Sequence, residues 1–328
     1  MSAQGFTRRR VLRLIAAGAA AWRVPVAVAD VPITRWRGQA FGADASLTIR
    51  DPDRARAERA LADCVVEIDR LERVFSLHRR DSALVALNGA GALVDPPTEL
   101  VDVLSFAARV SEVSGGAFDV TVQPLWGVYV RAQRNGWSRP DAFEAALDQA
   151  RARIGWRRLA IARDRLAFTS SGMAATLNGI AQGYATDRIA ERLRSHGFPH
   201  VLVDVGEFRG LGERDAGQPW RVGVAWPDRA GLATVLTLSD RAVATSSPLA
   251  TPFDSNGKNH HLFDPHSGRS AHGWTSVSVT APTAVLADAL STAIAVAPEA
   301  AAKTILVKGG GEEAILVDRR GRLVRLRA

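Results

Sequence analysis

The chain has 328 residues, and 47% of them are hydrophobic, which is enough to bury the core of one large domain or two small ones. Its formal net charge of +8 raises the question of a nucleic-acid partner, but five arginines stand before Asp30, where there is no acidic residue. The rest of the chain carries only +3, which does not require a polyanion, so we expect no nucleic-acid partner.

The first 29 residues have the features of a twin-arginine export signal. Arg8 and Arg9 precede a short apolar stretch at 14–21, and Ala27-Val28-Ala29 is an A-x-A cleavage site. The stretch is too short to span a bilayer. We therefore expect a signal peptide at 1–29, cleavage near Ala29, and a mature domain at 30–328 that works in the periplasm without a transmembrane segment. An ordinary basic N-terminal helix is the alternative.

The next predicted elements are a strand at 45–49 and a long amphipathic helix at 53–75. Cys64 is the only cysteine of the chain, which excludes intramolecular disulfides and thiolate metal clusters. It lies on the apolar stripe of the predicted helix, among residues spaced three or four apart. We therefore expect Cys64 to be a small core residue and not a catalytic thiol.

The remaining elements indicate an α+β fold. Strands fall in runs between pairs of helices without strict βαβ alternation, and no linker rich in Pro, Gly or Ser divides the mature chain. The predicted helices are 98–113, 141–150, 179–196, 283–296 and 299–307. The predicted strands are short antiparallel segments within 157–177, then 201–205, 220–225, 235–238, 242–245, 276–280, 313–317 and 323–326, and an alternating apolar and polar run covers 118–125.

Asp288 and Thr292 form the most informative local pattern. Residues four apart lie on the same face of a helix, so this carboxylate and this hydroxyl can offer two hard oxygen ligands to one cation. By itself the pair also fits a solvated helix face. The glycines of the chain do not follow the G-x-G-x-x-G spacing of a Rossmann turn, and Gly115-Gly116 alone predicts the end of a helix.

An ordered series of sequence blocks gives these patterns a context. The chain resembles the ApbE family of FAD:protein FMN transferases in the same order and at similar spacing beyond the first forty residues. The blocks are Phe41-Gly-Ala43, Leu71–His78, Gly115–Trp126, Leu177–Asp187, Leu202–Gly206, His261–Gly268 and Ala287–Ala293.

The resemblance implies a single α+β domain with mixed, largely antiparallel sheets and flanking helices. It also implies FAD as substrate and Mg²⁺ as cofactor, held by the Gly179 carbonyl and the Asp288 and Thr292 side chains. His261 and Asp288 would be catalytic, with His261 acting as a base or orienting a phosphate, and a purely structural turn histidine is the alternative. The implied flavin-binding residues are Phe41, His78, Ala117, Phe118, Asp119, Thr176, Gln182 and Leu262.

Several positions depart from the family pattern. Thr176 stands where the family usually has an acid and Gln182 where it has a lysine, and the glycine-rich run after strand 201–205 becomes Gly206-Glu207-Phe208. Some polar contacts to FAD are therefore expected to be lost or remodelled. A zinc site at His260, His261, His266 and His272 is a weaker alternative, because no cysteine or carboxylate pattern accompanies these histidines.

The sequence thus predicts transfer of FMN from FAD to a Ser or Thr hydroxyl of a periplasmic target protein, with release of AMP. The pattern is similar to the exported branch linked to maturation of periplasmic reductases. Two alternatives remain open: a non-catalytic FAD-binding maturation factor and an FAD pyrophosphatase that releases FMN to water. All three need FAD, and they differ in the fate of the flavin.

Overall fold

An eight-stranded antiparallel sheet forms the centre of the computed structural model, which describes residues 12–14 and 31–328. Of the predicted export signal at 1–29 only Leu12–Leu14 is described; its arginine pair and its cleavage site lie outside the described residues. The strands of this sheet, in spatial order, are β14 (Leu323–Arg327), β13 (Glu313–Asp318), β12 (Trp274–Ala281), β11 (Arg241–Ser246), β8 (Phe208–Leu211), β7 (Val201–Asp204), β3 (Ala43–Arg50) and β2 (Ile33–Ala40).

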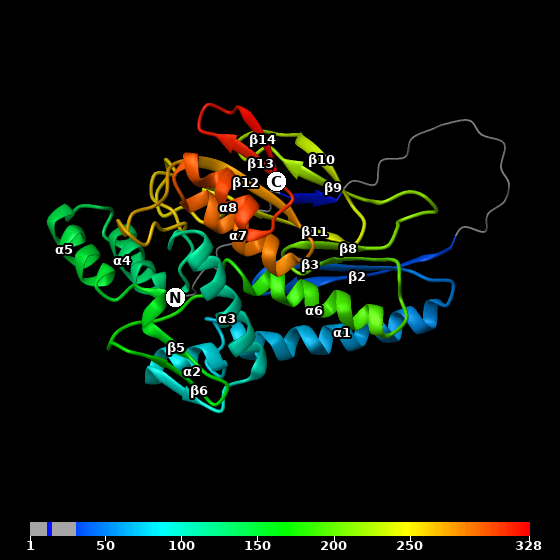
Figure 1. The fold of residues 1–328 in the computed structure, drawn as a ribbon, viewed down its shortest axis with the longest axis horizontal. Helices are drawn as coiled ribbons and strands as arrows, with labels where there is room; N and C mark the ends of the chain where they lie inside the picture. The colour runs from blue at the N-terminus through cyan, green and yellow to red at the C-terminus, as the bar shows by residue number, and fades with distance from the viewer. Residues whose placement is uncertain (1–11, 15–30) are drawn as a thin grey trace.

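Four helices cover one face of this sheet (Figure 1). Helix α8 (Ala302–Gly309) packs on β14, α7 (Ala284–Val296) on β11 and β12, α6 (Ala181–Ser195) on β7 and β8, and α1 (Arg54–Phe75) on β2. Helix α3 (Thr98–Val113) packs against α7 and α8. The apolar stripes of these amphipathic helices face the sheet, and this arrangement buries the main core.

A small second sheet covers the opposite face. It contains β1 (Leu12–Leu14), β9 (Trp220–Ala225) and β10 (Leu232–Leu238), all paired antiparallel. Alternate residues of one strand serve the two faces: Val203 belongs to the core under the helices, whereas Leu202 packs with Trp220 and Leu238 under the small sheet. This two-sided burial confirms the predicted α+β class.

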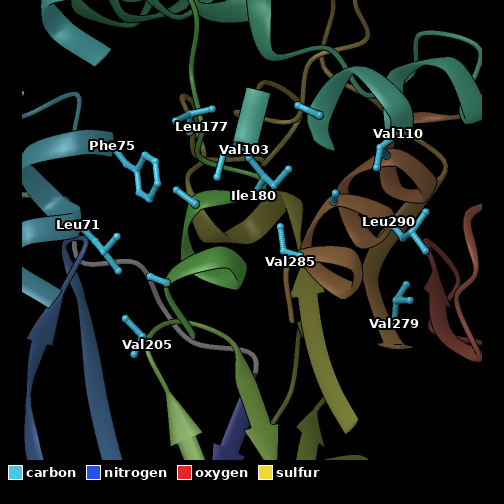
Figure 2. Packing of buried hydrophobic residues seen from close by; sticks show 14 of the residues in the cluster. Leu71, Phe75, Val103, Val110, Leu177, Ile180, Val205, Val279, Val285 and Leu290 are labelled. Atoms are coloured by element: carbon cyan, nitrogen blue, oxygen red, sulfur yellow. The ribbon is translucent and has the colours of Figure 1, made fainter. Parts of the chain in front are cut away.

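Figure 2 shows how the main core joins segments that are far apart in the sequence. Leu71 and Phe75 of α1 point toward the region of Ile180, just before α6, while Leu290 of α7 lies near Val279 of β12. Cys64 is fully buried in this core, as predicted, and burial raises the pKa of its thiol to about 12. Burial therefore disfavours the thiolate form at this position.

A helical extension lies at the left end of Figure 1. It consists of α4 (Gln123–Arg134) and α5 (Pro140–Arg151), with Tyr129 packed against Phe263 at a ring-centroid distance of 4.7 Å. A three-stranded sheet of β4 (Ala92–Val94), β6 (Arg165–Phe168) and β5 (Leu159–Ile161) lies near helix α2 (Ala83–Ala90). No helix in the described part of the chain is long and apolar enough to cross a membrane.

The observed elements differ from the sequence expectations in several places. The apolar and polar run 118–125 forms a 3₁₀ turn at Val120–Val122 and then the start of α4 at Gln123, with Pro124 in its first turn. Helices α2 and α4 and strands β2, β4 and β8 were not predicted. By contrast, α3 has the predicted bounds, and Gly115 and Gly116, both with positive φ, end it as expected.

Candidate active site

One pocket collects residues from most of the sequence blocks. Its wall includes the segment after α3, the start of α6, the loop after β7, the end of β11, the loop at 261–263 and the inner face of α7. Ten of the twelve predicted site residues lie on this wall: Ala117, Phe118, Asp119, Thr176, Gly179, Gln182, His261, Leu262, Asp288 and Thr292.

Helices α6 and α7 approach each other closely at the pocket floor. A Cβ atom at Gly183 would lie 2.4 Å from the Ala284 carbonyl oxygen, so only glycine fits there. The backbone N–H of Gly183 donates to Asp288 Oδ2 at 3.0 Å. A Cβ at Gly179 would likewise lie 2.7 Å from Thr292 Oγ1. The two glycines therefore let the start of α6 lie directly against the Asp288 and Thr292 side chains.

The oxygens gathered here suit a hard cation. Asp288 is 4% exposed and lines the pocket together with Thr292 and Gly179, so residues that carry a carboxylate, a hydroxyl and a backbone carbonyl border one space. Mg²⁺ prefers such oxygen ligands and shares its remaining positions with phosphate oxygens. Among the described residues, no group of three or more His, Cys, Asp or Glu side chains lies close enough together to hold a metal ion.

Asp187 fixes the beginning of α7. Its Oδ1 accepts hydrogen bonds from the backbone N–H of Ala284 at 2.8 Å and from Arg209 Nη1 at 2.6 Å, and its Oδ2 accepts from Val285 N–H at 2.9 Å. Thr283, the N-cap residue, makes no side-chain capping bond, so Asp187 caps α7 from another helix. Burial raises the pKa of Asp187, and the Arg209 charge opposes that shift. This contact sets the position of α7 one turn before Asp288.

The segment after α3 supplies one side of the pocket. Phe118 is only 4% exposed, and its ring also belongs to the main core. Asp119 lines the pocket, but both of its carboxylate oxygens accept hydrogen bonds from within the protein: Oδ1 from the N–H and hydroxyl of Thr121, and Oδ2 from the N–H of Trp156. Burial raises the pKa of Asp119, and these bonds oppose the shift. Asp119 therefore holds the turn that leads into α4.

The loop that carries His261 is held by its neighbour. His260 is 1% exposed, its Nε2 lies 2.7 Å from the Ala271 carbonyl oxygen, and its Nδ1 accepts from Leu262 N–H. Burial lowers the pKa of His260 to about 4, so the ring is neutral at pH 7 and Nε2 carries the proton it donates. His260 thereby keeps His261 and Leu262 on the pocket wall.

The positions that depart from the family pattern also face the pocket. Thr176 is held by a bond from its N–H to the Val120 carbonyl, and its hydroxyl accepts from Asn178 N–H. Gln182 lies against the backbone of Gly206, where an added Cβ would be 2.3 Å from its Nε2. Both positions therefore place neutral side chains at the pocket, Thr176 from the segment before α6 and Gln182 from its first turn.

Comparison with known proteins identifies the fold and its relatives. The model of the ApbE family matches residues 41–316. The chain belongs to the ApbE family. A FAD:protein FMN transferase of Treponema pallidum is 33% identical over 73% of this chain and 71% of its own length, and one of Klebsiella pneumoniae is 29% identical over 83% and 81%. The apo structure of the Pseudomonas stutzeri flavinyl transferase ApbE is 26% identical, covers 90% of this chain and 94% of its own, and has a TM-score of 0.73.

Two residues that the ApbE resemblance assigns to flavin binding lie off the pocket wall. Phe41 is at the β2–β3 turn with a φ of 51°, packs against the main core, and donates its N–H to Glu72 Oε1 at 2.5 Å. His78 is exposed in the loop after α1. Flavin binding by Phe41 or His78 stays a prediction. Such a contact requires that the bound FAD extend beyond this pocket.

Other residues of the pocket were not predicted as part of the site. Trp126 enters it from α4, and Glu207, which is 7% exposed, enters it from the loop between β7 and β8 and accepts a hydrogen bond from Thr245 N–H. Ser246 enters it from the end of β11. Trp126 and Glu207 lie in or beside an ApbE sequence block, but only the tertiary structure shows that they share one pocket with Ser246.

Proposed function

We propose that this chain transfers FMN from FAD to a Ser or Thr hydroxyl of another protein. The observation that carries the proposal is the pocket in which Gly179, Asp288 and Thr292 meet beside His261 and an aromatic wall. The named transferases among its relatives support the same activity. The pocket therefore has groups for a pyrophosphate, a cation and a flat ring in one place.

The chemistry is a phosphoryl-type transfer. The hydroxyl oxygen of the target bonds to the FMN phosphorus, the bond from that phosphorus to the bridging oxygen breaks, and AMP leaves. The hydroxyl proton passes to a base, and His261 is the candidate in the pocket. Asp288, Thr292 and the Gly179 carbonyl would hold Mg²⁺, which would neutralise charge on the pyrophosphate and on AMP.

The test is the fate of the flavin. Protein, FAD and Mg²⁺ are incubated with a candidate exported target, and the denatured target is scored for in-gel flavin fluorescence. Covalent fluorescence on the target supports transfer. FMN and AMP free in solution would instead indicate a pyrophosphatase, and bound, unreacted FAD would indicate a maturation factor that holds flavin.

Replacing Thr176 and Gln182 with the acid and the lysine that the family usually has is expected to raise the rate of FMN transfer. Thr176 and Gln182 carry no charge, and a charge-assisted contact contributes about 1.5–3 kcal/mol, so the double variant T176D/Q182K should transfer FMN at least about tenfold faster. The rate is measured by the same fluorescence assay. If the wild type and the double variant both bind FAD and both remain inert, the chain is a flavin-holding factor.

We propose further that the protein acts in the periplasm after folded export and that its acceptor is a periplasmic protein. Arg8, Arg9 and the site at Ala27–Ala29 support this location. Replacing Arg8 and Arg9 together with Lys should leave uncleaved precursor in the cytoplasm, as measured by fractionation and immunoblotting. Normal periplasmic accumulation of the variant would contradict twin-arginine export.

A further inference from the structure

Three hydroxyl groups form a chain between β11 and α7 at the edge of the pocket. Ser246 Oγ lies 3.0 Å from Thr292 Oγ1 and 2.8 Å from Ser291 Oγ. Ser291 Oγ in turn donates to the backbone carbonyl of Asp288 at 2.9 Å. Ser291 is fully buried and does not line the pocket, whereas Ser246 and Thr292 do. The chain therefore runs from the pocket into the protein interior.

The Asp288 carbonyl at the buried end determines the direction of each hydrogen bond among these three hydroxyl groups. A carbonyl can only accept, and each hydroxyl has a single proton. Ser291 uses its proton on the Asp288 carbonyl, so it must accept from Ser246. Ser246 has then used its own proton, so it must accept from Thr292. The Thr292 proton is thereby directed toward β11.

A threonine hydroxyl can bind a cation only through an oxygen lone pair, and its proton must point elsewhere. Resting on the proposed function, we infer that Ser246 and Ser291 are positioning residues that turn the Thr292 hydroxyl so that its lone pairs face the cation. Thr292 Oγ1 also lies close to the Gly179 backbone, where an added Cβ would be only 2.7 Å away, so the oxygen itself has little room to move. Partners that orient metal ligands in this way are typically worth 10- to 100-fold in metal affinity.

The inference predicts the effect of S246A on magnesium binding. Mg²⁺ is titrated by calorimetry into the FAD-bound full-length protein without any acceptor protein, so no FMN transfer contributes to the heat, and the solution is checked afterwards for free FMN and AMP. We expect the Mg²⁺ affinity of S246A to fall about 10- to 100-fold, because the Thr292 proton then has no fixed acceptor. Thermal unfolding without Mg²⁺ shows whether each variant is folded.

Two further variants separate orientation from direct contact. S291A should also weaken Mg²⁺ binding although Ser291 lies outside the pocket, because the Ser246 proton is then free to turn toward Thr292. In a T292V background, S246A should cause no further loss, which is the non-additivity expected of residues acting through one hydroxyl. The matched control is S278A: Ser278 is 1% exposed and lies 2.7 Å from the Thr245 hydroxyl, outside this chain of bonds. Its Mg²⁺ affinity should equal that of the wild type.

Unchanged Mg²⁺ affinity in folded S246A would overturn the inference. So would additive losses in S246A and T292V together with a normal S291A, because Ser246 would then contact the cation itself. A wild type that binds FAD with no Mg²⁺ dependence would show that the proposed metal site fails, and the inference with it. Failure of the proposed magnesium site therefore shows in the wild type, whereas failure of the positioning inference shows only in the variants.

Discussion

Replacing Asp187 with alanine is expected to lower the free energy of unfolding by about 3–5 kcal/mol, the usual cost of breaking a buried ion pair from one side. Asp187 is 5% exposed and Arg209 is 8% exposed, so the variant leaves a buried guanidinium without its carboxylate. It also leaves the Ala284 and Val285 N–H groups without their acceptor. Urea denaturation followed by circular dichroism measures the change.

The matched control for D187A is E144A. Glu144 pairs with Arg269 at 2.7 Å, but both side chains are more than half exposed, and exposed pairs contribute about 0–1 kcal/mol. E144A should therefore unfold almost like the wild type. Similar destabilisation in both variants would mean that the helix cap and the buried pair contribute nothing specific.

Replacing Asp288 with alanine is expected to lower the rate of FMN transfer strongly. Removing this carboxylate takes away the only acid of the proposed magnesium set, and metal stabilisation of the transferring group is worth several kcal/mol. About 3 kcal/mol corresponds to a loss in transfer rate of roughly 100-fold. FAD binding should remain, but Mg²⁺ should no longer strengthen it, as measured by calorimetry.

D288N serves as the control for D288A because an amide oxygen can still accept from Gly183 N–H, the bond that Asp288 Oδ2 makes at 3.0 Å. If D288N keeps the wild-type stability and also loses Mg²⁺ coupling, the defect belongs to the metal and not to the packing of α6 on α7. Unchanged Mg²⁺ coupling in D288A would show that the metal assignment is wrong.

Local patterns in the sequence were sufficient for the long helices. Helix α3 has the predicted bounds because an apolar periodicity and a glycine pair mark its body and its end, and α1 follows Asp53, whose side chain accepts from Arg56 N–H as an N-cap. Strand β2 was missed because it is an edge strand whose arginines and glycine interrupt the apolar alternation. Helix α4 was missed because a short 3₁₀ turn hides its start.

In the candidate site, too, local sequence patterns predicted some residues, whereas contacts between distant segments could not be predicted. The Asp288 and Thr292 pair could be predicted from helical spacing, and ten residues assigned through the family resemblance do meet in the pocket. The roles of Asp187 and Ser246 could not be predicted in this way. Their partners lie 97 and 46 residues away along the chain, and no periodicity records such a contact.

The contacts between α6 and α7 recur every four residues: Gly179 lies against Thr292, Gly183 against Asp288, and Asp187 against Ala284. One inserted residue between Gly183 and Asp187 would rotate Asp187 by about 100° around its helix and away from α7. The length of this helix segment is therefore as constrained as its composition. A substitution on the exposed face of α6 leaves these three contacts in place, whereas an insertion or deletion within the segment does not.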